Sequence, residues 1–191
     1  VHKVTVIPRG RALGLTWSLP EKDSFTQYKE QMLAEICMSF GGRVAEELFV
    51  GKISTGASSD FQRATDVARS MVTRYGMSDA LGPMVYREND GRSANTSNNV
   101  SEATMQQVDK EIRRILDEQY ALASKILQEN RSKVEAMTEA LMEWETLDAE
   151  QIGDIMAGNP PREPKPAPVT QPPQPPQDAA PTAPATPAQA V

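Results

Sequence analysis

The prolines of this sequence lie mostly at one end, and their distribution limits how much of the chain can fold. Only Pro8, Pro20 and Pro83 of the 15 prolines precede residue 160 in a chain of 191 residues. From Gly158 onward the sequence is rich in proline, alanine, glutamine and threonine, with too few apolar side chains to offset the entropy cost of ordering. We therefore predict a folded unit over residues 1–157 and a disordered Pro-rich tail over residues 158–191.

Apolar residues at helical spacing dominate the predicted folded unit. They form stripes from about residue 24 to 49, 58 to 75, 101 to 129 and 132 to 144, with a short helix at 148–156. A polar residue that can cap a helix N-terminus stands at the start of each stretch: Ser24, Ser58, Ser101, Ser132 and Asp148. The tight connection at residues 130–131 predicts that the two helices it joins form an antiparallel pair. Residues 87–99 have hardly any apolar side chains and are predicted to form a mobile surface loop.

The first 20 residues have the pattern of a β-hairpin. A short β-branched run at residues 4–7 precedes turn residues, and Leu13, Leu15, Trp17 and Leu19 then alternate with small or polar residues. The pattern predicts one buried face. The second strand is either simple edge sheet or a strand whose free edge pairs with an extended peptide. The fold class is therefore mainly α with a small N-terminal β-hairpin.

Composition excludes several functions. The net charge of −6 argues against nonspecific nucleic-acid binding, and no run of 18 apolar residues is present to span a membrane. Cys37 is the single cysteine and lies in a helical apolar pattern, which indicates a packing thiol. His2 is the single histidine and stands at the start of the chain, where residues are poorly ordered unless something ties them down, so we do not expect it to be a catalytic or metal-binding histidine of this chain alone. The chain does not start with Met, and we expect it to be a piece of a longer protein.

The stretch from Ser54 to Asp60 is a polar loop that runs into a well-specified amphipathic helix. Its Asp60 falls in the first helical turn, where an acid commonly complements the helix dipole. The alternative is a carboxylate that serves a site from a rigid base. Upstream, Gly41 and Gly42 either break their helix or let another backbone approach closely. Of Glu46 and the adjacent Glu47, one could face a polar site, although a solvated pair is the more common arrangement.

Several uncommon strings occur together and suggest a family. They are residues 7–14 (IPRGRALG), 40–47 (FGGRVAEE), 54–60 (STGASSD), 71–78 (MVTRYGMS) and 81–83 (LGP). In order and spacing they resemble the FtsH family of membrane-anchored, ATP-dependent AAA+ zinc metalloproteases, over roughly residues 1–157. The resemblance implies a mostly helical zinc-peptidase domain that follows an ATPase module in a homohexamer. It also implies processive degradation of unfolded membrane and cytosolic proteins at the cytoplasmic face of the bacterial inner membrane.

The resemblance also assigns site residues. It implies that zinc is held by two histidines of an HExxH helix and by Asp60, while the HExxH glutamate acts as general base. Glu46 is then an outer carboxylate near the site or a rival third ligand. The strand around Leu13, Gly14 and Leu15 is the candidate for pairing with substrate.

The sequence departs from this family pattern in one important respect. Neither HExxH nor the phosphate-binding motif GxxxxGK[ST] occurs in the 191 residues. We therefore expect no catalytic residue, no ATP site and no membrane segment in this chain, and an inactive fragment when it stands alone. The alternative is a non-catalytic helical module for oligomerisation or partner docking.

Overall fold

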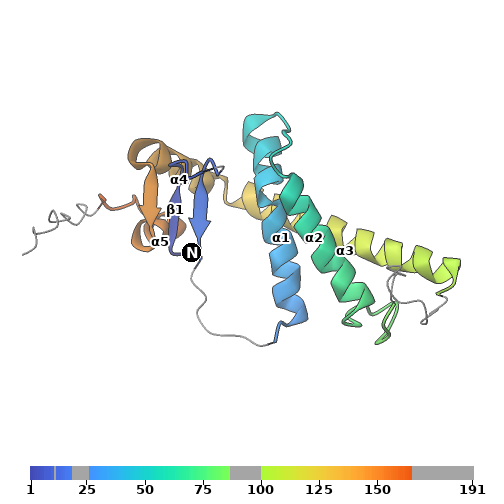
Figure 1. Cartoon of the computed structure of the whole chain (residues 1–191). Helices are drawn as coiled ribbons and strands as arrows, with labels where there is room; N and C mark the ends of the chain where they lie inside the picture. The colour runs from blue at the N-terminus through green and yellow to red at the C-terminus, as the bar shows by residue number, and fades with distance from the viewer. Residues whose placement is uncertain (11, 19–25, 87–99, 165–191) are drawn as a thin grey trace, which may run out of the picture.

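The computed structural model describes residues 1–10, 12–18, 26–86 and 100–164. Its strands are β1 (Lys3–Thr5), β2 (Leu15–Trp17) and β3 (Thr146–Asp148), and its helices are α1 (Lys29–Ala45), α2 (Ser58–Thr73), α3 (Glu102–Glu129), α4 (Arg131–Trp144) and α5 (Ala149–Met156). One turn of π-helix, η1 (Glu46–Val50), continues α1. Figure 1 shows two lobes, a bundle of α1, α2 and α3 and a small sheet with α4 and α5. The mainly α fold class with an N-terminal hairpin is confirmed.

The core of the bundle comes from the apolar stripes of α1, α2 and α3. Its fully buried members include Ile36, Val44, Ala64, Ala68, Met71, Val72 and Val108. Alanine at two successive turns of α2 leaves room for α1 to pack closely. The two glycines do not break α1, and a Cβ added at Gly41 or Gly42 would meet nothing within 4 Å. Among the described residues, therefore, no neighbouring backbone requires glycine at either position.

The sheet has three antiparallel strands in the order β2-β1-β3. In β1, Val4 pairs with Thr16 of β2 on one side and with Leu147 of β3 on the other. The hairpin is confirmed, but all three residues of β2 are exposed, so the expected buried face is wrong for this strand. The buried contacts of the sheet lie instead on β3, where Leu147 is fully buried.

The second core lies under the sheet and not along α3. Ala140, Leu147 and Ile155 are buried there, with Met137, Leu141 and Trp144 packed around them. The predicted antiparallel pairing of α3 with α4 is therefore wrong, because the apolar face of α4 packs on β3 and α5. Asn130 joins the two helices and directs them into different lobes (Figure 1).

Helix starts were predicted with mixed success. Ser101 accepts from the backbone N–H of Thr104, and Asp148 forms a capping box with Gln151, as expected. Ser58 is not a cap, since α2 begins there after Ala57, and α4 begins at Arg131 and not after Ser132. Ser24, residues 87–99 and residues 165–191 of the predicted tail lie outside the described residues. No helix in the described ranges has both the length and the apolar character of a membrane span.

Candidate functional site

Asp60 lies in the first turn of α2, on a helix that is anchored in the core of the bundle. Ala64 and Ala68, one and two turns further along, are fully buried, so the start of the helix has a fixed base. Asp60 itself is half-buried. Its carboxylate makes no hydrogen bond or ion pair with any other residue that the structure describes. Such a carboxylate is free to complement the helix dipole or to bind a cation.

Glu46 begins the π-helical turn and reaches the loop that leads to Asp60. Its Oε2 accepts from the backbone N–H of Ser54 at 3.1 Å, and its Oε1 accepts a very short hydrogen bond from the Ser54 hydroxyl. These bonds, the side-chain bond first, lower the pKa of Glu46, with a further contribution from the charge of Arg43. Arg43 donates from Nη2 to the Ser54 carbonyl at 2.7 Å. Two side chains from one helix thus hold three groups of Ser54.

Glu47 has a different partner from Glu46. Its Oε1 accepts from the hydroxyl of Tyr120 at 2.6 Å, which ties η1 to α3. Burial and this carboxylate raise the pKa of Tyr120 to about 12. The two glutamates are therefore not a simple solvated pair, because each anchors the π-helical turn to a separate segment. No local sequence pattern points to this contact, because Tyr120 is 73 residues from Glu47.

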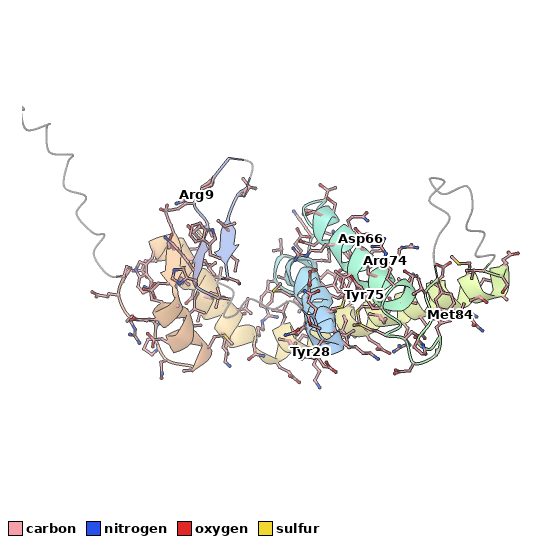
Figure 2. All side chains as sticks on the ribbon, turned by 60° about the horizontal axis from the view of Figure 1, so that its bottom comes forward. Arg9, Tyr28, Asp66, Arg74, Tyr75 and Met84 are labelled. Carbon is pink, nitrogen blue, oxygen red and sulfur yellow. The ribbon has the colours of Figure 1, made fainter. Side chains whose placement is uncertain are left out.

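The candidate substrate strand lies in the sheet lobe, away from the start of α2. Leu13 is 84% exposed, and Leu15 begins β2, which has a strand partner on one edge only among the described residues. Gly14 packs against β1, since an added Cβ would lie 2.9 Å from the Thr5 carbonyl oxygen. Figure 2 shows Arg9 on the β1–β2 turn, apart from Asp66 and Arg74 of the α2 region.

The described residues do not form a complete metal site. No group of three His, Cys, Asp or Glu side chains among them is placed to hold a metal ion. His2 is exposed in the sheet lobe, where its backbone N–H donates to the Trp17 carbonyl. Burial raises the pKa of the Cys37 thiol, opposite to the change that a nucleophilic cysteine needs. A zinc site with three protein ligands would therefore need at least one ligand from outside the described residues.

Sequence comparison decides the family. Residues 1–155 match the profile of peptidase family M41. The chain belongs to peptidase family M41. This match confirms the resemblance to the FtsH family.

Several curated relatives are named ATP-dependent zinc metalloprotease FtsH. The protein of that name from Cupriavidus metallidurans is 65% identical over 168 residues, which are 86% of this chain and 26% of the relative. That from Myxococcus xanthus is 45% identical, over 91% of this chain and 28% of the relative. That from Bacillus subtilis is 48% identical, over 82% of this chain and 25% of the relative. The chain thus spans about a quarter of the length of these relatives.

Proposed function

We propose that this chain is the C-terminal part of the peptidase domain of an ATP-dependent zinc metalloendopeptidase, and that Asp60 is one of its zinc ligands. The observation that carries the proposal is the half-buried carboxylate of Asp60, which has no bonding partner in the described part of the chain, at the start of a helix anchored in the core. In a capping box, the acid at the third helical position reaches back to the backbone N–H of the N-cap residue, which is Ala57 here. Asp60 makes no such bond within the described residues, so its oxygens are available to a cation.

The chemistry of the donor fits zinc. A catalytic zinc site takes three protein ligands, and two histidines with one carboxylate form a common set. The histidines would come from the HExxH helix that the family resemblance places upstream. Bound zinc would lower the pKa of its water to about 7, which supplies the nucleophile for peptide hydrolysis. This chain would supply one ligand, Asp60, from a rigid helix that fixes the direction of its carboxylate.

The proposal extends to the whole protein. It would be a homohexamer that degrades unfolded membrane and cytosolic proteins processively, with ATP bound in a separate ATPase module. It would lie at the cytoplasmic face of the bacterial inner membrane and be anchored by N-terminal segments outside this chain. The outer edge of β2 at Leu15, which has no strand partner among the described residues, would pair with the extended substrate through its backbone donors and acceptors.

The test compares this chain with a version extended upstream through the HExxH helix. We expect the extended protein to bind about one zinc per chain, measured by metal analysis, and to cleave an unfolded protein. We expect the 191-residue chain alone to bind zinc weakly and to have no protease activity. If the extended protein binds no zinc, the metallopeptidase proposal fails, and a non-catalytic assembly module becomes the better account.

A further inference from the structure

The loop before Asp60 is anchored through one residue, Ser54, whose backbone N–H, carbonyl and hydroxyl all form hydrogen bonds. Ser54 donates its backbone N–H and its hydroxyl to Glu46, and its carbonyl accepts from Arg43. The Ser54 hydroxyl oxygen also accepts from the backbone N–H of Gly56 at 3.1 Å. The position of the loop is therefore set by two side chains of the neighbouring helix, four residues before α2 begins at Ser58.

The same arginine also contacts the residue that follows Asp60. The guanidinium carbon of Arg43 lies 5.1 Å from the centre of the Phe61 ring, within the range of a cation–π interaction. Phe61 in turn packs on Phe40 of α1, with ring centres 5.7 Å apart. Asp60 thus lies between two contacts of Arg43, one in the preceding loop and one at the next residue.

Arg43 and Glu46 also brace each other. Arg43 Nε lies 3.4 Å from Glu46 Oε2, an ion pair one helical turn apart. Their side chains are only 15% and 26% exposed, so water screens this pair less than it screens the surface pairs of α3. Glu46 reaches the loop from the start of η1, and the π-helical turn closes when the N–H of Gly51 donates to the Glu46 carbonyl at 2.8 Å. Single π-helical turns often occur at functional sites.

We propose that Arg43 and Glu46 are positioning residues for Asp60, acting through Ser54 and Phe61 to fix the direction in which the carboxylate meets the metal. This inference rests on the proposed zinc role of Asp60. It also separates two roles for Glu46, since a positioning residue needs only to bind Ser54, whereas a third ligand must give its own charged oxygen to the metal.

The test uses the extended, zinc-binding protein, with zinc affinity measured by chelator competition. Glu46→Ala and Arg43→Ala should weaken zinc binding by about 10- to 100-fold, the usual effect of losing a group that orients a ligand. Glu46→Gln should bind within about threefold of wild type, because its carbonyl can accept from the Ser54 N–H while its amide donates to the hydroxyl. If Glu46→Gln loses affinity as severely as Glu46→Ala, the positioning role is wrong and Glu46 is a ligand.

A spectroscopic readout separates positioning from general loss of structure. In the cobalt-substituted protein, Glu46→Ala should shift the visible absorption bands, which report the coordination geometry, while Glu46→Gln should keep the wild-type spectrum. Ser54→Ala, which removes one hydroxyl, should shift them in the same direction and serves if Glu46→Ala fails to fold. Unchanged bands and affinity in both Glu46→Ala and Ser54→Ala would overturn the inference.

A matched control exists on the same pair of helices. Arg63 of α2 donates to Glu35 of α1 at 2.9 Å, a tie that does not involve the loop. Arg63→Ala should leave zinc affinity unchanged, and an equal loss in this variant would overturn the inference by showing that any α1–α2 tie has the same effect. Asp60→Ala tests the proposed function separately, because wild-type zinc binding in this variant would refute the zinc role of Asp60. If Asp60→Ala loses zinc while Glu46→Ala and Arg43→Ala bind it normally, only the positioning role is refuted.

Discussion

Tyr120 of α3 donates a 2.6 Å hydrogen bond to Glu47, so the third helix is fastened to the π-helical turn that follows the first. The Tyr120 ring also packs edge-on against Phe40 at 5.2 Å, which places the hydroxyl at the margin of the apolar core. Tyr120→Phe keeps the ring contact and removes the bond. We expect a loss of about 1 kcal/mol in the free energy of unfolding at pH 7, measured by urea denaturation.

Tyr120 should also make the free energy of unfolding depend on pH in the alkaline range. The folded state raises the pKa of Tyr120 to about 12 from 10, so the folded chain binds this proton more tightly than the unfolded chain. The resulting stability is complete below pH 10 and is lost as the pH rises through about 12. Wild type should therefore lose more stability than Tyr120→Phe between pH 10 and 12. Parallel pH profiles for the two proteins would contradict this assignment.

Gly76 is predicted to be intolerant of any side chain. It has a φ of +61° after the end of α2, and an added Cβ would lie 2.8 Å from the Cα of Pro83. Gly76→Ala should cost about 2–3 kcal/mol, because left-handed strain adds to a clash with backbone. Gly82→Ala is the control: its φ is +69°, but an added Cβ meets nothing within 4 Å, so about 1 kcal/mol is expected. Equal losses in denaturation would show that the Pro83 contact is unimportant.

Glu111 is predicted to contribute to acid sensitivity. Its carboxylate, 13% exposed, binds Arg114 and accepts from the buried hydroxyl of Ser78 at 2.8 Å. The hydrogen bond from Arg114 first, and then that from Ser78, lower the pKa of Glu111 in the folded state. This stability is present above the unfolded pKa of about 4.5 and is lost as the pH falls through the lower folded value.

Glu111→Gln should therefore cost about 1 kcal/mol at pH 7 and lose less stability than wild type on acidification. Glu118 also pairs with Arg114 but is 55% exposed, so Glu118→Gln should change stability by less than about 0.5 kcal/mol. Denaturant titrations at pH 7 and at pH 4 measure both effects. A larger loss in Glu118→Gln than in Glu111→Gln would contradict the buried-contact explanation.

The helices were predictable because their evidence is local. The apolar spacing of residues 101–129 specifies one long amphipathic helix, and the structure has it from Glu102 to Glu129 with Ser101 as its cap. Gly76, three residues after the end of α2, has a φ of +61°, the left-handed conformation in which a glycine near a helix end is a local signal. In each case, the residues that form the sequence pattern are within a few positions of the structural feature that they predict.

The features that were missed depend on distant partners. The strand β3 has three residues and pairs with β1 from more than 140 residues away, so no local pattern marks it. The partners of Glu46 and Glu47 likewise come from a loop and from α3, and spacing alone could not separate their roles. Asp60 became a candidate zinc ligand only because the family strings contain it, whereas helical periodicity indicated a first-turn acid and no more.

The most direct test of the zinc assignment is the metal content of two carboxylate variants of the extended protein. Asp66, which is exposed on the same helix and accepts from Gln62, serves as the control (Figure 2). We predict that Asp60→Ala abolishes stoichiometric zinc binding and proteolysis together, while Asp66→Ala keeps about one zinc per chain and normal cleavage. Full zinc occupancy and normal activity in Asp60→Ala would contradict the assignment of Asp60 as a ligand.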